Sequence, residues 1–368
     1  MGRQPTAAAP LDNRERGHVN TIVLGGTTVG DGHPPYIIAE IGSNHNGDMD
    51  LCRRLIDAAA DAGAHAVKFQ SWSESSLIAR EEYDRNPDYS DKKKHFGSLR
   101  EMVREYQLTP EQHVEAQGYC RSRSVVFCSS VFSPEEADFL ERLDVPFFKI
   151  ASMDVVNLPL LVFVARKQRP MIIATGMAAL AEVDRAVATI RGEGNEQIVL
   201  LHCVSIYPPD YGSIRLLNME MLRQAFDVPV GFSDHTLGTS IPLAAIALGA
   251  CLIEKHFTLD KDMAGWDHAI SADPGELRMI VEEGRHVFDS LGGLPRIVTD
   301  AEIDKRRKFR RSLVARHALS RGCVLTEGDL IAKRPGSGIS PDEIQYVLGR
   351  RLTDEIEEDR VIRWEDLQ

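Results

Sequence analysis

The chain of 368 residues is 43% hydrophobic and carries a formal charge of −12. This length suffices for one large domain with a buried core and a smaller second domain. The negative charge disfavours nucleic acid and anionic lipid, so neither nucleic acid nor membrane is expected as a partner. The one dense basic run, residues 305–311, is interpreted as a solvated or partner-facing linker, because no aromatic-interleaved basic surface accompanies it.

The six cysteines lie far apart without a CxxC pair, which predicts reduced thiols and no disulfide. The N-terminal residues lack the apolar core of a leader peptide, and no run is apolar and long enough to cross a membrane. A soluble, cytoplasmic protein is therefore expected, with residues 1 to about 18 disordered.

The first predicted element is a hairpin, residues 21–37, which would seal the bottom of a barrel. From residue 36 to 291, short apolar runs then alternate with longer amphipathic segments, a pattern typical of parallel strands covered by helices. Strands are predicted at residues 36–41, 64–70, 125–130, 145–150, 170–175, 197–203, 228–233 and 251–257. Eight consecutive βα units favour a closed (β/α)8 TIM barrel, an α/β fold, over an open sheet.

Residues 73–108 are charged and poorly periodic, so they are predicted to be a long insertion after the second strand and a candidate lid. Ser133 and Pro134, followed by two glutamates, predict the start of a helix. After Gly292 the βα pattern gives way to short strands and turns. The expected divisions are a tail and hairpin (1–34), the barrel (35–295), a linker (296–310) and a small β-rich domain (311–368).

Polar residues stand at the ends of all eight predicted strands, where barrels of this kind carry their catalytic groups. They are Glu40, Lys68, Gln70, Ser129, Ser130, Lys149, Ser152, Thr175, His202, Ser205, Ser233, Asp234, His235, Glu254, Lys255 and His256. Any one of them could be a satisfied polar group at the rim. Their joint occurrence indicates a functional site.

Lys68 and Lys149 each follow an apolar run, where an unpaired ammonium group would be costly to desolvate. Each lysine therefore requires an anion, either a neighbouring carboxylate or a ligand. Serine hydroxyls on the neighbouring strand ends favour a phosphorylated or carboxylated ligand.

His235 and His256 end the seventh and eighth strands, which are neighbours in a barrel. A single histidine is usually structural, but two on adjacent strand ends, beside Asp234 and Glu254, favour a metal site for Mn²⁺, Co²⁺ or Zn²⁺. His202 is interpreted as a packing residue or a support behind the site.

Several stretches together resemble the sialic acid synthase (N-acetylneuraminate synthase) family, including its legionaminate and pseudaminate relatives. They are YIIAEIGSNHNGD, AHAVKFQ, FFKIAS, ATGM, LHCVSIYP, VGFSDHTLG, ALGACLIEKHFTLD, GWDHAISADP and KRPGSGI. The match runs in order along nearly the entire chain. The resemblance implies a phosphoenolpyruvate-dependent nonulosonate synthase on a TIM barrel, with a C-terminal antifreeze-like (SAF) domain.

The resemblance also implies roles for individual residues. Phosphoenolpyruvate would be held by Lys68, Lys149, Ser130, Ser152, Ser205 and Ser233. The sugar would be surrounded by Glu40, Gln70, Tyr207 and Asp267, and Asp154 and Thr175 are counted with the substrate-binding residues. His235 and His256 would bind a divalent metal, Mn²⁺ first, with Mg²⁺ or Co²⁺ as alternatives. Arg334 would reach the sugar of a partner subunit in a domain-swapped homodimer.

The implied reaction joins phosphoenolpyruvate to an open-chain, N-acylated hexosamine-type aldehyde and releases phosphate by C–O cleavage. A carboxylate such as Glu40 can stabilise the cationic intermediate or handle the proton of the attacking water. Which carboxylate does so stays open at this point.

Some positions depart from the family pattern. Ala174 stands where the family often has Ser, Asp154 where it often has Glu, Ser205 where many sialate synthases have Asn, and Trp266 where they commonly have Pro. These changes line the sugar and phosphate region, so the acceptor need not be N-acetylmannosamine.

Three other functions are compatible with parts of the sequence. A metal-dependent hydrolase is disfavoured because Glu40 and His256 stand where that class needs an HxH pair and an Asp. A Schiff-base aldolase could use Lys149 or Lys255. A binding protein without turnover is the third: the full set of lysines and histidines argues against it, although the missing hydroxyl at Ala174 is a point in its favour.

Overall fold

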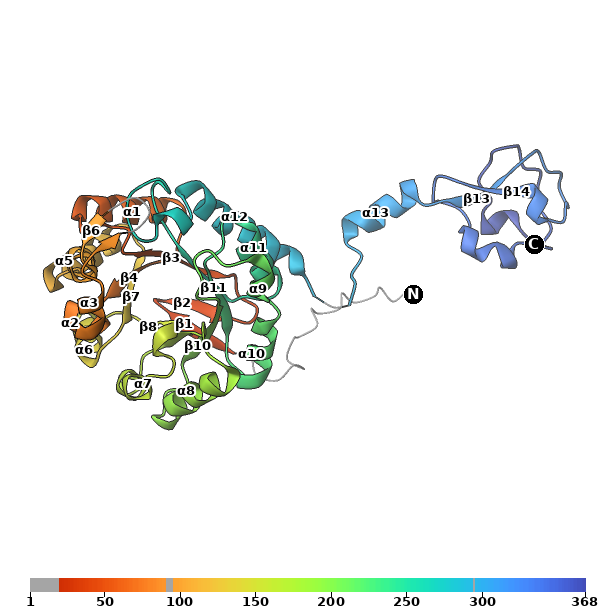
Figure 1. Ribbon diagram of the computed structural model, residues 1–368. Helices are drawn as coiled ribbons and strands as arrows, with labels where there is room; N and C mark the ends of the chain where they lie inside the picture. The colour runs from red at the N-terminus through yellow and green to blue at the C-terminus, as the bar shows by residue number, and fades with distance from the viewer. Residues whose placement is uncertain (1–19, 91–94, 294) are drawn as a thin grey trace. The chain divides into compact units, whose positions relative to one another are not determined.

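The computed structural model describes residues 20–90, 95–293 and 295–368. The disorder expected for residues 1 to about 18 lies outside these residues. The chain separates between Leu291 and Gly292 into two units, which are described in turn (Figure 1).

The first unit is built on a closed barrel of eight parallel strands in the order β10-β11-β12-β3-β4-β7-β8-β9. The strands are β3 (Tyr36–Gly42), β4 (Ala66–Ser71), β7 (Val126–Val131), β8 (Phe148–Ile150), β9 (Met171–Ala174), β10 (Ile198–Cys203), β11 (Val230–Asp234) and β12 (Leu252–His256). Each predicted strand overlaps one of these, which confirms the TIM barrel.

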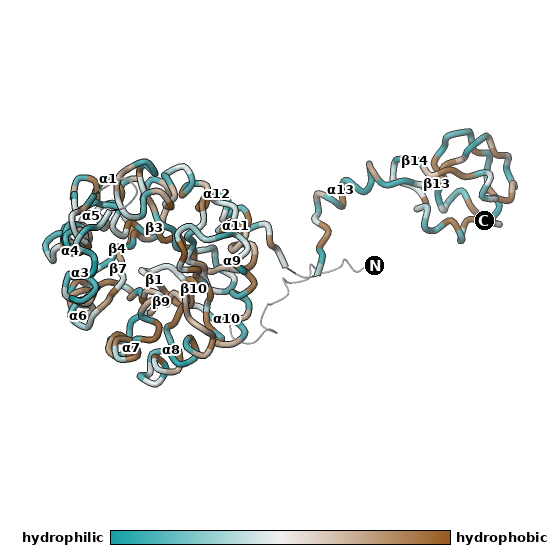
Figure 2. The backbone as a smooth tube through the Cα atoms, in the orientation of Figure 1, coloured by the Kyte–Doolittle hydropathy of each residue, from teal (hydrophilic) through white to brown (hydrophobic). Residues whose placement is uncertain are grey.

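Helices cover the outside of the barrel. They are α1 (Met49–Asp61), α5 (Pro110–Ser122), α6 (Pro134–Arg142), α7 (Leu158–Ala165), α8 (Leu180–Gly192), α9 (Tyr211–Ile214), α10 (Asn218–Phe226), α11 (Ser240–Ala247) and α12 (Pro274–Leu291), with the 3-10 turns η2 (Ser152–Asp154) and η3 (His268–Ile270). Helix α6 begins where the sequence predicted, because the Ser133 side chain accepts a hydrogen bond from the Glu136 N–H. Figure 2 shows hydrophobic residues along β9 and α7 and hydrophilic ones along α3.

The hairpin predicted before the first barrel strand is present as β1 (Thr21–Leu24) and β2 (Thr27–Gly30), paired antiparallel. Its buried residues Leu24 and Val29 join an apolar cluster with Tyr36, the first residue of β3. The hairpin therefore closes the N-terminal end of the barrel with apolar side chains, as expected.

The insertion after the second strand is folded. It contains α2 (Glu74–Leu77), α3 (Arg80–Arg85), β5 (Tyr89–Ser90), β6 (His95–Gly97) and α4 (Leu99–Tyr106). These elements share a small core of Trp72, Tyr83, Phe96, Leu99, Met102, Val103 and Tyr106. The core was hard to see in the sequence because its residues are spread over several short elements, none long enough to show a period.

The second unit contains α13 (Asp300–Phe309), β13 (Ser312–Ala315), β14 (Leu330–Lys333) and the 3-10 turns η4 (Glu327–Asp329), η5 (Pro341–Tyr346) and η6 (Trp364–Asp366). Its core gathers Leu313, Leu319, Leu330, Val347, Leu352, Ile356 and Ile362. The basic run expected in a linker lies largely in helix α13. Thr299 caps the N-terminus of this helix, because its side chain accepts a hydrogen bond from the Glu302 N–H.

All six cysteines are free, as predicted. In the part of the chain that the structure describes, no helix is both long and apolar enough to cross a membrane.

Candidate functional site

A cavity of about 260 Å³ lies at the C-terminal ends of the barrel strands. Most of the predicted site residues line it, namely Glu40, Lys68, Gln70, Ser130, Lys149, Ser152, Ser205, Tyr207, Ser233, His235 and His256. They come from all strands except β9, whose last residue Ala174 also lines the cavity. The barrel thus brings together side chains that are far apart in the sequence.

The two-residue period of a strand decides which strand-end residues face this cavity. On β12, Glu254 and His256 line the cavity, whereas Lys255 between them does not. Lys255 Nζ instead lies 2.6 Å from Asp234 Oδ2. This buried ion pair faces away from the cavity, so neither residue belongs to the site. His202 also lies outside it, with Nε2 2.6 Å from the Ile214 carbonyl oxygen.

The two buried lysines of the cavity are held by two buried glutamates. Lys68 Nζ lies 2.6 Å from Glu40 Oε2 and 3.9 Å from Glu254 Oε2, and Lys149 Nζ lies 3.6 Å from Glu254 Oε1. The neighbouring carboxylates that sequence reasoning held open as partners are therefore present. Glu254, expected beside the histidines, stands between the two lysines.

Burial and this pairing shift the pKa values of both glutamates and of Lys149. Burial raises the pKa of Glu40, an effect that Lys68 opposes and Glu254 reinforces. The pKa of Glu254 is lowered: burial acts against this, but Lys149 and Lys68 outweigh it. Burial lowers the pKa of Lys149. Glu40 is therefore the carboxyl group that most readily carries a proton.

Hydroxyl groups complete the polar lining. Ser130 Oγ accepts a hydrogen bond from Lys68 Nζ at 3.1 Å, and Ser233 Oγ donates to Glu254 Oε1 at 3.1 Å. The backbone also comes close at Gly176, where an added Cβ would lie 2.2 Å from Ser205 Oγ. Glycine at this position therefore keeps space open beside the serines.

His235 and His256 lie together in the cavity with ring centroids 5.4 Å apart. His235 Nδ1 lies 3.0 Å from the Val204 carbonyl oxygen, which leaves its other ring nitrogen free for a ligand. Burial, together with His235 and nearby lysines, holds the pKa of His256 far below its usual range, and its buried Nδ1 has no hydrogen-bond partner among the described residues. The pKa of His235 is raised: burial acts against this, but the hydrogen bond to Cys203 outweighs it. A neutral imidazole is the form that binds metals, so His256 is held in that form and His235 must lose its proton when a metal binds.

Within residues 20–90, 95–293 and 295–368, no group of three or more His, Cys, Asp or Glu residues is placed to hold a metal ion. The two imidazoles fit a divalent ion that takes its remaining ligands from substrate or water. Asp267 Oδ2 lies 3.7 Å from His256 Nδ1, and burial raises the pKa of Asp267 to about 6.

Four predicted site residues do not line the cavity. Asp267 lies behind the cavity wall, next to the lining residue His256. The Thr175 hydroxyl donates to the Leu201 carbonyl oxygen at 3.0 Å, and Asp154 accepts a hydrogen bond from the Asn157 amide at 3.1 Å. Arg334 belongs to the second unit, where its guanidinium lies 5.0 Å from the ring centroid of Phe309.

Sequence reasoning missed several cavity residues. They are Phe132, Ala151, Met153, Met177 and Cys203. Phe132 directly follows β7, so a search for all residues just beyond strand ends, apolar ones included, would have found it.

Comparison with protein families gives two matches. Residues 55–295 match the model of the NeuB family, and residues 310–368 match that of the SAF domain.

Individual relatives cover nearly the whole chain. The N,N'-diacetyllegionaminic acid synthase of Legionella pneumophila is 39% identical over 343 residues, covering 90% of this chain and 94% of the relative. The pseudaminic acid synthase of Helicobacter pylori is 34% identical over 323 residues, covering 87% and 94%. The crystal structure of an N-acetylneuraminic acid synthetase from Leptospira borgpetersenii in complex with citrate has a TM-score of 0.71 and 31% identity, covering 78% of this chain and 95% of that one.

Proposed function

The chain belongs to the NeuB family, and on that premise we propose that it condenses phosphoenolpyruvate with an open-chain, N-acylated hexosamine-type aldehyde. The products are a nonulosonic acid and phosphate. The observation that carries the proposal is the cavity in which two buried lysines, two paired glutamates and two imidazoles meet.

The lysines supply the positive charge that phosphoenolpyruvate needs. Lys68 and Lys149 are buried in a protein whose formal charge is −12, so they concentrate cationic groups where the average surface would repel an anion. The Ser130 hydroxyl accepts a hydrogen bond from Lys68, so its own O–H would be a donor to the phosphate or carboxylate, whereas the Ser233 O–H is donated to Glu254.

His235 and His256 would hold a divalent ion, Mn²⁺ by preference with Mg²⁺ or Co²⁺ as alternatives. When bound, such an ion supplies Lewis-acid polarisation of the aldehyde oxygen.

Glu40 is suited to the proton chemistry. In the proposed reaction a bond forms between the methylene carbon of phosphoenolpyruvate and the aldehyde carbon. Water then adds to C2, and phosphate leaves with cleavage of its bond to C2. Glu40, with its raised pKa and its Oε1 held 2.7 Å from Gln70 Nε2, would take the proton of that water.

The sugar would lie between Gln70, Tyr207 and Asp267. We further propose that Arg334 of a second copy reaches this sugar in a domain-swapped homodimer. Replacing Arg334 with Ala should then raise the KM of the sugar at least tenfold with little change in the KM of phosphoenolpyruvate. An equal rise in both constants would argue against this role.

The decisive experiment is a phosphate-release assay with phosphoenolpyruvate, Mn²⁺ and a panel of aldoses. The panel contains N-acetylmannosamine, the diacetamido hexoses that lead to legionaminate and pseudaminate, and mannose as a non-acylated control. Release with an N-acylated sugar, with an ¹⁸O label at the bridging oxygen recovered in phosphate, is the expected result. If no aldose supports release, the proposal fails.

The metal proposal has its own test. His256→Ala should lower both turnover and the Mn²⁺ content measured after dialysis, because one of two imidazole ligands is lost. Unchanged Mn²⁺ content would remove His256 from the metal site.

A further inference from the structure

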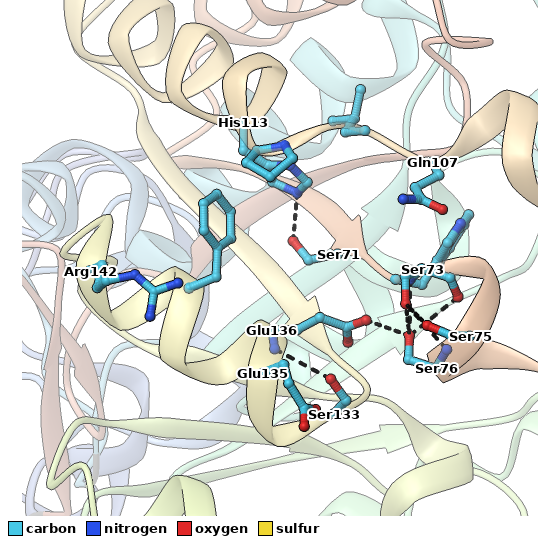
Figure 3. A pocket seen from close by; sticks show the side chains of 14 residues that line it. Ser71, Ser73, Ser75, Ser76, Gln107, His113, Ser133, Glu135, Glu136 and Arg142 are labelled. Carbon is cyan, nitrogen blue, oxygen red and sulfur yellow. Dashed lines mark hydrogen bonds between the residues drawn. The ribbon is translucent and has the colours of Figure 1, made fainter.

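A second pocket, of about 680 Å³, lies outside the barrel beside β4 and β7, and we name it the outer pocket. It is lined by residues of α2, α5 and α6 and shares no lining residue with the catalytic cavity. Figure 3 shows the side chains of Ser73, Ser75 and Ser76 on one wall, with Glu136 directed toward Ser76. The proposed function gives this pocket no role.

The lining combines hydroxyl groups with aromatic faces. Besides the three serines of α2 and its cap, Ser71, Ser133 and Gln107 contribute polar groups. Trp72 and Phe139 contribute ring surface, and the buried Trp72 Nε1 has no hydrogen-bond partner among the described residues. Hydroxyls, an amide and aromatic faces around one space suit a pyranose ring, which offers C–H faces and hydroxyls together.

The charges of the outer pocket argue against an anion. The lining contains Glu135, Glu136 and Arg142, so it has one more acidic than basic group. Glu136 already accepts hydrogen bonds from the Phe132 N–H at 3.0 Å and from the Ser76 hydroxyl. Because a phosphate or carboxylate would meet this negative balance, a neutral sugar is the better occupant.

An aromatic contact separates the outer pocket from the catalytic cavity. The Trp72 ring lies edge-on to Phe132, with centroids 6.0 Å apart, and Phe132 lines the catalytic cavity. Trp72 also lies edge-on to Trp266, at 6.4 Å, and Trp266 directly precedes Asp267. A ligand that shifts Trp72 would therefore act on Phe132, which lines the cavity, and on Trp266, which precedes Asp267.

The floor of the outer pocket adds a second connection. Ser71 Oγ lies 2.7 Å from both His113 Nε2 and Ser129 Oγ. On β4, Ser71 directly follows Gln70, and on β7, Ser129 directly precedes Ser130. Because successive side chains of a strand point to opposite faces, the pocket floor and the cavity wall are the two faces of the same strands.

We propose that the outer pocket binds a neutral pyranoside and that its occupant changes the affinity of the catalytic cavity for the acceptor sugar. The binding part stands on the outer pocket alone, whereas the effect on affinity rests on the proposed function.

The probe for binding is the methyl glycoside of N-acetylglucosamine, which cannot open to an aldehyde and so cannot react as an acceptor. Saturation-transfer NMR on the full chain should show binding. Ser75→Trp, at an exposed residue of the pocket wall, should abolish the signal, and Glu135→Trp from α6 should do the same. Ser122→Trp, an exposed serine of α5 outside the pocket, is the matched control and should keep it.

Two outcomes overturn the binding proposal: no signal for the wild-type chain, or a signal that survives both pocket variants while their melting temperatures match the control. Glucose 6-phosphate should give no signal at the same concentration, and stronger binding of this anion would also overturn the proposed ligand class.

The kinetic part is measured by phosphate release with and without saturating probe. The probe should change the KM of the acceptor sugar at least threefold and leave that of phosphoenolpyruvate unchanged, and Ser75→Trp should remove the effect. An unchanged acceptor KM despite binding would reject the coupling. A chain without synthase activity would refute the proposed function while the NMR result still decides whether the pocket binds.

Discussion

The two ends of the barrel interior differ sharply although the same strands build both. At the N-terminal end, Tyr36 and Phe147 pack with Leu24 of the hairpin in an apolar layer. At the C-terminal end, Lys68 and Lys149 are buried with carboxylates. On β4, Ala66 belongs to the apolar layer, and Lys68, two residues further along the same face of the strand, lines the catalytic cavity.

This difference teaches that stability and function are divided along the barrel axis. Apolar burial stabilises the fold by about 25 cal/mol per Å². Buried charges cost desolvation free energy, which their pairing offsets only in part. Substitutions at the charged end should therefore affect substrate use first, and substitutions at the apolar end should affect unfolding first.

The largest expected effect is at Lys149. Lys149→Met should raise the KM of phosphoenolpyruvate by about 100-fold or more, because a charge-assisted contact to the anion is lost. Stability should change less, since Glu254 keeps Lys68 as a partner at 3.9 Å. Steady-state kinetics and thermal melting measure the two effects. Lys167→Met, at a lysine outside the cavity, is the control, and an unaltered KM for Lys149→Met would contradict the assignment.

At the opposite end, Leu24→Ala should lower the free energy of unfolding by about 3 kcal/mol, as cavity-forming substitutions of buried leucine do. Both KM values should stay within about twofold of wild type. Urea unfolding measures the loss. The exposed Val23 on the same strand supplies the control, because Val23→Ala should change stability by less than about 0.5 kcal/mol. Loss of substrate affinity in folded Leu24→Ala would break the division between the two ends.

Asp267 tests how much the ionisation of a buried carboxyl group beside the cavity lowers the stability of the fold. Its folded pKa of about 6 lies above the unfolded value of about 3.9, so the folded state holds the proton more tightly. The group therefore favours folding at low pH, and this contribution is lost as pH rises from about 4 to about 6.

In metal-free protein, Asp267→Asn should therefore raise the free energy of unfolding by about 2 kcal/mol at about pH 7.5 and by much less near pH 4. Melting temperatures across this range measure the difference. A gain of the same size at both pH values would show that ionisation is not its cause.

The smallest expected effect is at Ala174, which stands at the boundary between the apolar and charged ends. Ala174→Ser should lower the KM of phosphoenolpyruvate about fivefold, because one added hydrogen bond contributes about 1 kcal/mol. Ala174→Cys, of similar size with a weak donor, should give no such gain. A higher KM with Ser would indicate crowding instead of a missing hydroxyl.

The barrel could be predicted because its strands are short, apolar and buried on both faces, and because helices with a clear period separate them. The convergence of Lys68, Lys149 and the histidines followed from topology alone, since parallel strands end at one rim. The pairing of each lysine with a particular glutamate did not follow, because side-chain geometry within a layer depends on register and rotamer.

Other features needed the structure for physical reasons. The Thr175 hydroxyl is used by the Leu201 carbonyl of the neighbouring strand, a contact that no sequence pattern records. The insertion core and the outer pocket arise where short elements from different parts of the chain pack together, as Trp72 does with Phe132 and Trp266.

The two buried lysines and two buried glutamates of the cavity sum to zero formal charge. A trianion entering this balanced group creates a net negative interior unless protons or a cation enter with it. In metal-free protein Glu40 is the natural site for an arriving proton, since burial already raises its pKa. Phosphoenolpyruvate binding to metal-free protein should therefore be accompanied by proton uptake, and its calorimetric enthalpy should vary with the ionisation enthalpy of the buffer. With the divalent ion bound this uptake should be smaller, because the ion balances the charge and Glu40 stays ionised, as its role toward the attacking water requires.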